Sequence, residues 1–295
     1  MLTVLTCQLM GWSVVKIAYV TYDGPDDDRD VMLAHWRESG VDGTAVRWDD
    51  PGAAWDAFDA AVVRSTWDYV ERRGEFLAWA RRASAVTRLL NPASVIERNT
   101  DKTYLRDLAA VGVPTVPTSW VGPGYEPRLP SFEEYVVKPA VSAGARDTVR
   151  TSVASEAARH AGRIAAKGGT AMVQPYLRMV EEEGELSLLY FGGRFSHAVR
   201  RPAMLARDDG RPRANHVGAE LRAPAPDQVA LAEKVLGEIA EPLLYARVDL
   251  VRLPDGTPAL IELELTEPYL YLSGAPGAVG RFTDALREIL RDDDA

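Results

Sequence analysis

Residues 245–264 read Tyr-Ala-Arg-Val-Asp-Leu-Val-Arg-Leu-Pro-Asp-Gly-Thr-Pro-Ala-Leu-Ile-Glu-Leu-Glu. Two runs that alternate apolar and polar residues flank a Pro-Asp-Gly turn signal, and this pattern predicts a β-hairpin. We expect Asp255 and Gly256 to form a two-residue loop, because Asp-Gly is a favoured pair in tight hairpin turns. The loop then fixes which residues of the two strands face each other.

In that register Asp249 faces Glu262, and Arg247 faces Glu264. Side chains alternate along a strand, so these four lie on one face of the hairpin. The opposite face is expected in the core and contains Ala246, Val248, Leu250, Ile261, Leu263 and Leu265. Facing carboxylates repel each other and require a cation. Carboxylate oxygens without His or Cys suit Mg²⁺ carried on nucleotide phosphates. The alternative is a solvated face of an amphipathic hairpin.

The composition of the 295-residue chain excludes several classes of protein. Its net charge of -9 comes from interspersed acidic and basic residues, which argues against a nucleic-acid partner or an anionic membrane surface. Cys7 is the only cysteine, so an intrachain disulfide is excluded and a reducing cytoplasm is expected. The sequence has no apolar run of the roughly 18 residues that a transmembrane helix requires.

Residues 1–14 are apolar but lack a basic n-region and a small-residue cleavage site, so a signal peptide is not expected. A clean strand pattern begins at residue 15. We therefore interpret residues 1–14 as a flexible extension or a misassigned start.

Residues 15–95 predict a small open α/β domain. Strands are expected at 15–21, 44–48, 60–64 and 87–91, and helices at 31–39 and 76–83. The strand at 60–64 is apolar almost throughout, as in a parallel sheet that is covered on both faces. Open parallel sheets bind ligands beyond the C-terminal ends of their strands. The loops at 22–26 and 64–69 follow such strands and are candidates for substrate selection.

The rest of the chain predicts two further subdomains, at 96–178 and 179–295. A helix is expected at 101–111, capped by Asn99 or Thr100 and ended by Gly112. The remaining expected strands and helices are strands at 135–139, 147–150, 170–174, 186–190 and 194–199 and helices at 155–167 and 280–291.

Several residues suit a nucleotide, although each has an ordinary alternative. Lys138 ends a strand before the small-residue loop 142–146, and such a loop can cradle phosphates with backbone N–H groups and one cation. A lysine beside a surface hairpin, or a solvated helical lysine at Lys102, is the alternative. Residues 172–177 can present backbone groups to an adenine edge. An ordinary core strand is the other interpretation of that segment.

Four more polar residues are less specific. Glu185 can hold a ribose, although an exposed glutamate is the default. The arginines Arg200 and Arg201 can neutralise a phosphate or a carboxylate, or form a surface charge pair. His197 is best interpreted as a neutral packed histidine.

The order of these residues resembles that of the ATP-grasp ligases over roughly residues 96–267. The hairpin looks like the Ala-Arg-x-Asp…Glu-x-Asn pattern of D-alanine–D-alanine ligases and glutathione synthetases, with Glu264 in place of the usual Asn. The loop at 142–146 has fewer glycines than in some relatives. The resemblance implies an ATP-grasp fold with an N-terminal open α/β domain, a central lid and a C-terminal antiparallel sheet.

Within that superfamily, the chain resembles the cyclo-ligases of D-cycloserine biosynthesis, which close O-ureido-D-serine into a ring with ATP. The likeness spans most of residues 15–270. It is carried by residues 64–69 (Arg-Ser-Thr-Trp-Asp-Tyr), 75–79 (Glu-Phe-Leu-Ala-Trp), 99–105 (Asn-Thr-Asp-Lys-Thr-Tyr-Leu), 112–118 (Gly-Val-Pro-Thr-Val-Pro-Thr) and 195–200 (Phe-Ser-His-Ala-Val-Arg).

The resemblance assigns roles to residues of this chain. It implies that Asp249, Glu262 and Glu264 bind two Mg²⁺ ions, for which Mn²⁺ can substitute, and that Arg247 and Lys138 take part in catalysis. The residues that it implies for ATP binding are Lys102, Lys138, Ser142, Gly144, Gln174, Pro175, Tyr176, Leu177, Glu185 and Arg201.

The implied activity is ADP-forming ligation of a carboxylate to a nitrogen through an acyl phosphate. The expected partner is a small amino-acid-like carboxylate, and a homodimer is compatible with the resemblance. Two alternatives stay open, namely a ligase that joins two separate molecules and a non-catalytic ATP-binding protein on the same fold.

Overall fold

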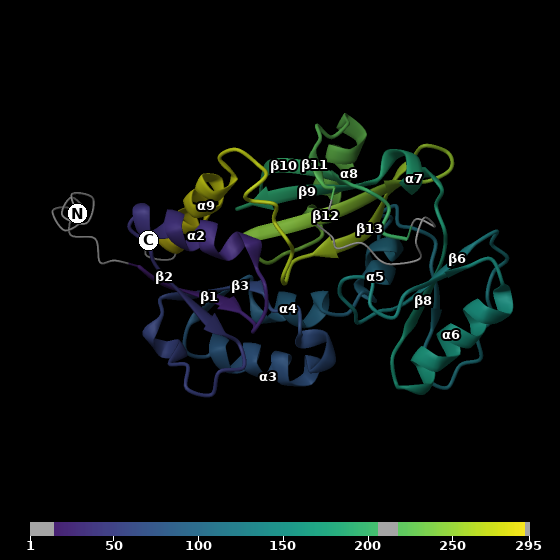
Figure 1. Ribbon diagram of the computed structural model, residues 1–295, viewed down its shortest axis with the longest axis horizontal. Helices are drawn as coiled ribbons and strands as arrows, with labels where there is room; N and C mark the ends of the chain where they lie inside the picture. The colour runs from purple at the N-terminus through teal and green to yellow at the C-terminus, as the bar shows by residue number, and fades with distance from the viewer. Residues whose placement is uncertain (1–14, 206–217, 293–295) are drawn as a thin grey trace.

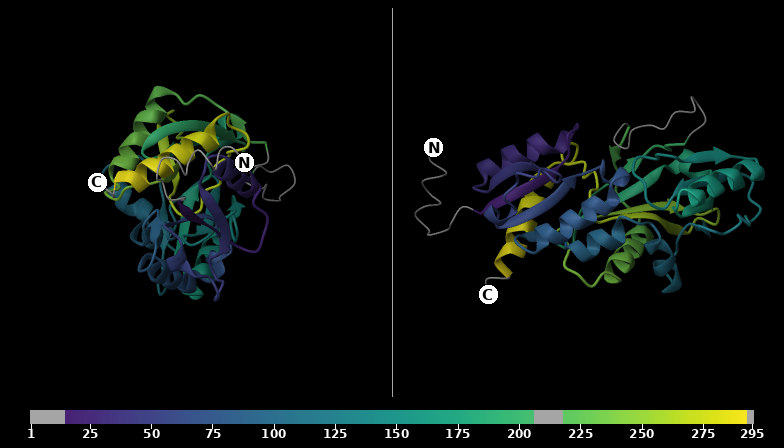
Figure 2. Two further views of the ribbon diagram at one scale, coloured as in Figure 1. Left: turned by 90° about the vertical axis from the view of Figure 1, so that its left-hand side faces the viewer. Right: turned by 90° about the horizontal axis from the view of Figure 1, so that it is seen from below.

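The computed structural model describes residues 15–205 and 218–292, so the interpretation of residues 1–14 and the position of Cys7 lie outside the described residues. Three sheets follow one another along the described chain (Figure 1). The lid sheet and the N-terminal sheet lie at opposite ends of the molecule, with the C-terminal sheet between them (Figure 2). This arrangement confirms the predicted α/β fold with an antiparallel C-terminal sheet.

The N-terminal sheet is parallel, as the sequence predicts. Its strand order is β2 (Asp42–Arg47), β1 (Lys16–Thr21), β3 (Ala60–Ser65) and β4 (Arg88–Leu90). Helices α2 (Asp27–Glu38) and α3 (Arg73–Ser84) pack beside it. Helix α2 begins four residues before the expected start at residue 31, because the Asp26 side chain caps it by accepting from the Asp28 N–H at 3.2 Å.

The lid sheet is antiparallel and carries one long helix. Its strand order is β5 (Ser119–Val121), β8 (Ala171–Pro175), β6 (Tyr135–Pro139) and β7 (Val149–Thr151), with α6 (Ala154–Ala166) packed on it. The small apolar face of α6, which includes Ala157, Ala161 and Ile164, is buried against Val137 and Val173 of the sheet. Small residues allow the helix to approach the strands closely.

The C-terminal sheet provides the platform for the hairpin. Its strand order is β11 (Glu220–Leu221), β10 (Arg194–Arg201), β9 (Glu185–Phe191), β12 (Tyr245–Arg252) and β13 (Pro258–Glu264). Two helices that the sequence analysis did not predict are α7 (Met179–Glu183) and α8 (Pro226–Gly237). Helix α8 contributes Leu231, Ala232 and Val235 to the core on one face of this sheet.

The helix predicted at 101–111 is wrong in its first turn. The chain forms α4 (Ala93–Asn99) and then α5 (Tyr104–Ala110), so Lys102 lies in the turn between two helices. Asn99 ends α4 and caps no helix; its amide instead bonds to the backbone of the Leu263–Leu265 segment. Gly112 ends α5 as expected, with φ of 84°.

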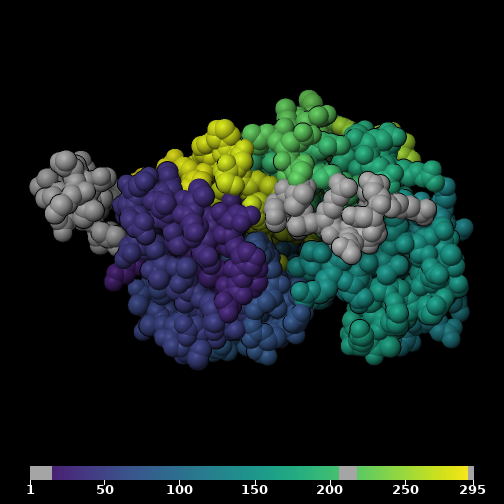
Figure 3. Space-filling view, viewed as in Figure 1, coloured from purple at the N-terminus to yellow at the C-terminus, as the bar shows by residue number. Residues whose placement is uncertain are grey.

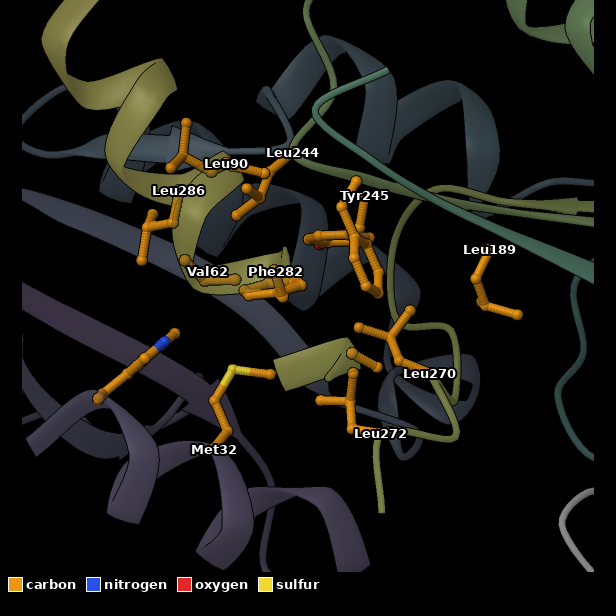
Figure 4. Packing of buried hydrophobic residues seen from close by; sticks show 14 of the residues in the cluster. Met32, Val62, Leu90, Leu189, Leu244, Tyr245, Leu270, Leu272, Phe282 and Leu286 are labelled. Atoms are coloured by element: carbon orange, nitrogen blue, oxygen red, sulfur yellow. The ribbon is translucent and has the colours of Figure 1, made fainter. Parts of the chain in front are cut away.

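The chain returns to its N-terminal region at its C-terminal end. Helix α9 (Ala278–Asp292) packs beside α2, and one apolar cluster joins both to the C-terminal sheet (Figure 4). In this cluster Met32 and Val62 face Phe282 and Leu286 of α9, and Tyr245 of β12 stacks on Phe282 at 6.1 Å between ring centroids. The boundaries at 15–95, 96–178 and 179–295 stay predictions.

The hairpin has the predicted pairs at its metal end but a different turn. Arg247 pairs with Glu264 and Asp249 with Glu262, as expected. The loop has three residues, Pro254, Asp255 and Gly256, and Gly256 adopts φ of 83°. The Leu253 N–H donates to the Thr257 carbonyl, and the Gly256 N–H donates to the Leu253 carbonyl, both at 2.9 Å. The predicted two-residue loop is therefore wrong.

A β-bulge corrects the register further along the hairpin. Leu250 pairs with Leu260 and Asp249 pairs with Glu262, so Ile261 is an extra residue on β13. The sequence analysis placed Ile261 on the core face, which is wrong. The bulge turns this side chain toward the cavity described below, where it lines the wall.

Strand β13 is at the edge of the sheet, yet side chains satisfy its outer backbone groups. The Asn91 amide donates to the carbonyls of Tyr245 and Leu265 at 2.9 and 2.8 Å. The Asn99 amide donates to the Leu263 carbonyl at 2.7 Å and accepts from the Leu265 N–H at 2.7 Å. These bonds replace a neighbouring strand and hold the hairpin in place. Within the described ranges, no helix is both long and apolar enough to cross a membrane.

His197 of β10 is buried, as expected from the sequence, and burial keeps it neutral. Its Nε2–H donates to the Leu270 carbonyl at 3.0 Å, because a carbonyl can only accept. Burial, with a smaller contribution from Arg281, lowers the pKa of His197 to about 4, although the hydrogen bond to Leu270 opposes the shift.

We predict that His197 makes the fold acid-sensitive between pH 6.5 and 4. The unfolded chain takes up a proton near pH 6.5 and the folded chain only near pH 4, so a fall in pH through this window favours unfolding. The loss is about 3 kcal/mol for a shift of this size. Urea denaturation of His197→Gln at pH 7.0, 5.5 and 4.5 should show a flatter dependence of stability on pH. An unchanged slope would contradict the assignment.

Candidate active site

One cavity of about 640 Å³ lies where the three sheets meet. Strands β6 and β8 of the lid sheet form one wall, and β12 and β13 form the other. The loops that follow β1 and β3 close one end. The molecular surface is hollowed between the blue N-terminal residues and the teal lid (Figure 3). Thirteen of the predicted site residues line this cavity: Lys102, Lys138, Ser142, Gly144, Gln174, Pro175, Tyr176, Leu177, Glu185, Arg201, Arg247, Glu262 and Glu264.

Asp249 is the predicted site residue that does not line the cavity, because its side chain is completely buried behind the arginines. One carboxylate oxygen from each of Asp249, Glu262 and Glu264 nevertheless lies within 4.8 Å of the other two. The three carboxylates therefore form a cluster whose outer two members face the cavity.

Two buried arginines neutralise Asp249. Arg247 donates from Nε and Nη2 to its two oxygens, both at 2.9 Å. Arg201 donates to it at 2.8 Å, and the Ser187 hydroxyl donates at 2.7 Å. Burial of Asp249 would raise its pKa, but Arg201 and Arg247 outweigh burial and hold the pKa below its usual range.

The two glutamates of β13 have different partners. Glu262 lies 3.1 Å from the Lys102 ammonium, and Glu264 pairs with Arg247. Burial raises the pKa of Glu262, but Lys102 and Lys138 outweigh it and the net pKa is lowered. Burial, together with repulsion by the charges of Glu262 and Asp249, raises the pKa of Glu264 to about 7. The attraction of Arg247 opposes this shift but does not cancel it. The carboxylates therefore still repel one another, although Arg201, Arg247 and Lys102 pair with them.

This donor set fits a hard divalent cation. The cluster offers only carboxylate oxygens, which is the ligand type that Mg²⁺ and Mn²⁺ prefer. A divalent ion would relieve the repulsion that raises the Glu264 pKa. Glu262 and Glu264 face open space in the cavity, so they are free to bind an ion that enters with a nucleotide.

Cations line the cavity beside these carboxylates. Among the described residues, the Lys138 ammonium makes no hydrogen bond or ion pair, and burial lowers its pKa. Lys102 instead donates to the Ser142 carbonyl at 2.6 Å, which ties it to the loop above. In that loop Gly144 and Ala145 adopt φ of 61° and 57°, and Arg146 forms an ion pair with Glu71 across the cavity. The loop therefore covers a positively charged part of the cavity.

The far end of the cavity is an apolar slot beside the end of β8. Val116, Leu177 and Val180 belong to one small cluster that borders it, together with Ile261. Gln174 is fixed by a 2.8 Å bond from its amide to the Thr118 hydroxyl. Met172, the first residue of the segment 172–177, is completely buried in the core below and does not line the cavity.

The two arginines after β10 have separate roles. Arg201 is buried, lines the cavity and pairs with Glu185 at 2.7 Å. Arg200 points away from the cavity, donating to the Glu182 and Glu183 carbonyls at 3.0 and 2.6 Å. Alternation along the strand separates these neighbours. Arg200 is therefore the surface residue of the pair.

The end of the cavity next to the N-terminal sheet is formed as expected by the loops 22–26 and 64–69. Tyr22 and Trp67 line it, with Tyr269 and a fourth acid, Glu267. The sequence analysis did not identify Glu267. The sequence Glu-Leu-Glu-Leu-Thr-Glu at 262–267 places a third acid close to the two predicted metal ligands of this strand. However, Glu267 lies beyond the end of the strand, where alternation no longer predicts the direction of a side chain.

Comparison with known proteins agrees with this arrangement. The family model described as "D-cycloserine synthetase DcsG, N-terminal domain" matches residues 17–91. The cycloserine biosynthesis protein DcsG of Streptomyces lavendulae is 38% identical over 285 residues, covering 90% of this chain and 95% of the relative. The crystal structure of D-cycloserine synthetase DcsG superposes with a TM-score of 0.87 at 36% identity, over 93% of this chain and 99% of that one.

The fold is shared more widely. D-alanine–D-alanine ligase from Bacillus anthracis, solved in complex with ATP, superposes with a TM-score of 0.64 at 13% identity, over 95% of this chain and 100% of that one. The chain is thus an ATP-grasp ligase, and other proteins of this fold were solved with ATP, or with Mg and ADP. Within this class it belongs to the D-cycloserine synthetase DcsG family.

We predict that Glu262→Gln lowers ADP formation at least about 100-fold, the usual effect of removing one electrostatic group from an active site. Glu262 faces the cavity and pairs with Lys102, which keeps its bond to the Ser142 carbonyl, so its replacement should lower the melting temperature less than that of Asp249. Asp249→Asn is a poorer test, because it leaves two buried arginines without their full counter-charge. The assay is ADP release with a Mg²⁺ titration, and Glu233→Gln on exposed α8 is the control. Full activity of Glu262→Gln would refute the metal assignment.

Lys138→Ala should weaken binding of an ATP analogue by about 1.5–3 kcal/mol, the value of a hydrogen bond to a charged group. The free ammonium in the cavity is the physical reason. Calorimetric titration with Mg²⁺ and AMPPNP measures the affinity, and Lys167→Ala, at an exposed lysine beyond α6, should bind as the parent does. Equal affinities for both variants would mean that Lys138 contacts no phosphate.

Proposed function

We propose that this chain is an ATP- and Mg²⁺-dependent carboxylate–amine ligase that closes O-ureido-D-serine to D-cycloserine. Family membership over nearly the whole chain is the observation that carries the proposal. It is supported by the gathering of acids, cations and an apolar slot in one cavity. A small-molecule substrate fits a cavity of this size. A cytoplasmic location and a homodimer stay predictions.

The cavity suits ATP along its length. The apolar slot and the end of β8, from Gln174 to Leu177, would hold the adenine, and Glu185 would hold the ribose. Lys102 and Lys138, with the backbone of Ser142 and Gly144 in the covering loop, would hold the α- and β-phosphates. Arg201 contributes positive charge beside them.

Asp249, Glu262 and Glu264 would hold the metal, as two Mg²⁺ ions or as Mn²⁺ in their place. Bound there, the ions would neutralise charge on the transferring phosphoryl group. Asp249 would contribute mainly its negative charge, because Arg201 and Arg247 already donate hydrogen bonds to its oxygens. Glu262 would exchange its contact with Lys102 for the metal, which frees the lysine for a phosphate.

The chemistry needs no protein nucleophile. The substrate carboxylate attacks the γ-phosphorus, ADP leaves, and an acyl phosphate forms while Arg247 stabilises developing negative charge. The nitrogen bonded to the side-chain oxygen then attacks the acyl carbon, loses its proton and expels phosphate. Because this nitrogen belongs to the same molecule, ring closure gains from proximity. The ring still carries a carbamoyl group, and one water molecule removes it as carbamate to leave D-cycloserine.

We predict that purified protein with Mg²⁺-ATP releases ADP when O-ureido-D-serine is the sole added carboxylate, and that mass spectrometry detects the cyclic product. A cyclo-ligase requires no second nitrogen donor. A panel of amino acids, each with and without hydroxylamine, supplies the comparison.

The other outcomes of this assay each identify a different protein. ADP release that requires an added amine would replace the proposal with an intermolecular ligase. ATP binding without ADP release across the panel would indicate a non-catalytic nucleotide-binding protein.

A further inference from the structure

Beyond the metal carboxylates, the cavity ends in a group of aromatic rings beside two acids, Glu267 and Asp27, of which Asp27 accepts a 3.5 Å hydrogen bond from the Tyr269 hydroxyl. This aromatic end consists of Tyr22, Trp67, Tyr69, Tyr269 and Glu267, all of which line the cavity. The Trp67 ring meets Tyr22 edge-on at 5.7 Å and lies 6.4 Å from the Tyr269 ring, as measured between centroids. The two cavity ends therefore differ, because the opposite end has aliphatic side chains and cations.

Two hydrogen bonds fix Glu267 in this aromatic end. The Trp67 indole N–H donates to the Glu267 carbonyl at 2.9 Å, and the Tyr69 hydroxyl bonds to its carboxylate. Tyr69 is itself immobile, because it is buried and stacks on Phe76 with 5.0 Å between ring centroids. The carboxylate is consequently held in place before any ligand arrives.

Glu267 differs from the three metal-site acids in having no cation of its own. Asp249, Glu262 and Glu264 each pair with an arginine or a lysine. Over residues 15–205 and 218–292, no lysine or arginine lies within ion-pair distance of Glu267. Burial and the nearby Glu264 charge raise its pKa to about 8, which is the expected behaviour of a carboxylate that lacks a counter-ion.

A fixed carboxylate among aromatic ring faces matches one kind of chemical group. The faces of Trp and Tyr rings attract ammonium groups, and a carboxylate adds a charged hydrogen bond. The same surroundings would repel a phosphate or a second carboxylate. An ammonium group bound there would supply the counter-ion that Glu267 lacks and would favour its ionised form.

We propose that Glu267, flanked by Trp67 and Tyr269, binds the α-ammonium group of the substrate. This inference rests on the proposed ligase function, which places the substrate carboxylate beside Arg247 and the metal acids. In an α-amino acid the ammonium group is attached to the carbon next to the carboxylate, so the two groups need adjacent sites of opposite charge. Glu267 supplies the second site three residues after Glu264. It would thus restrict the enzyme to carboxylates that carry an α-amino group.

The main experiment compares the binding of two ligands to two proteins, and two further variants serve as controls. The ligands are O-ureido-D-serine and the analogue in which hydrogen replaces the α-amino group, titrated calorimetrically with Mg²⁺ and AMPPNP present. The proteins are the full parent chain and Glu267→Gln, which keeps the size of the side chain and an acceptor for Tyr69. The parent should bind the analogue on the order of 10- to 100-fold more weakly than O-ureido-D-serine, the value of one charged hydrogen bond.

Glu267→Gln should bind O-ureido-D-serine about as weakly as the parent binds the analogue, and should no longer distinguish the two ligands. Glu267→Asp, which keeps the charge, should restore part of the preference. Glu75→Gln removes an exposed carboxylate outside the cavity and should keep the preference of the parent.

Three results would overturn the inference: a preference retained in Glu267→Gln, an equal loss of both ligands, and a parent that binds neither ligand. Because the titration requires no turnover, it is independent of the ligase assay. Ammonium-dependent binding without ADP release would reject the ligase but keep the ammonium site. ADP release with unaltered binding by Glu267→Gln would reject the ammonium site but keep the ligase.

Discussion

The active site depends on the contact of two buried arginines with Asp249. Three carboxylates on two paired strands repel each other, and burial makes their charges more costly. Arg247 on β12 and Arg201 on β10 supply the opposite charge from within the same sheet, at 2.9 and 2.8 Å. Removal of the acid or of either base would leave a buried charge without a partner. The contact therefore stabilises the sheet and leaves Glu262 and Glu264 available on its cavity side.

A second constraint holds these two glutamates at a fixed place. Strand β13 lies at the edge of its sheet, where a strand would normally be easy to displace. Asn91, Asn99 and Tyr104 bond to its end, and the Leu260 N–H donates to the Pro114 carbonyl at 2.8 Å. A metal site needs ligands held within a fraction of an ångström. These contacts also couple the helices α4 and α5 to the site, although neither helix contributes a metal ligand.

The sequence predicts the face of the hairpin because period-two alternation is insensitive to small errors. The expected two-residue loop was wrong, but the three-residue loop and the bulge at Ile261 compensate, so Asp249 still faces Glu262. The face on which Ile261 lies could not be predicted, since the alternation of apolar and polar residues does not reveal a β-bulge. Glu267 was missed for a similar reason, because its direction depends on Trp67 and Tyr69, which are about 200 residues away. Long-range packing decides such positions.

The central claim is that one cavity holds the nucleotide, the metal and an amino-acid substrate in that order. A crystal structure with AMPPNP and Mn²⁺, with anomalous scattering used to locate the metal, tests it most directly. The account predicts Mn²⁺ bonded to oxygens of Glu262 and Glu264, phosphates at Lys138, and the adenine against Leu177. Manganese bound elsewhere, or a nucleotide that leaves Lys138 without a contact, would contradict the account.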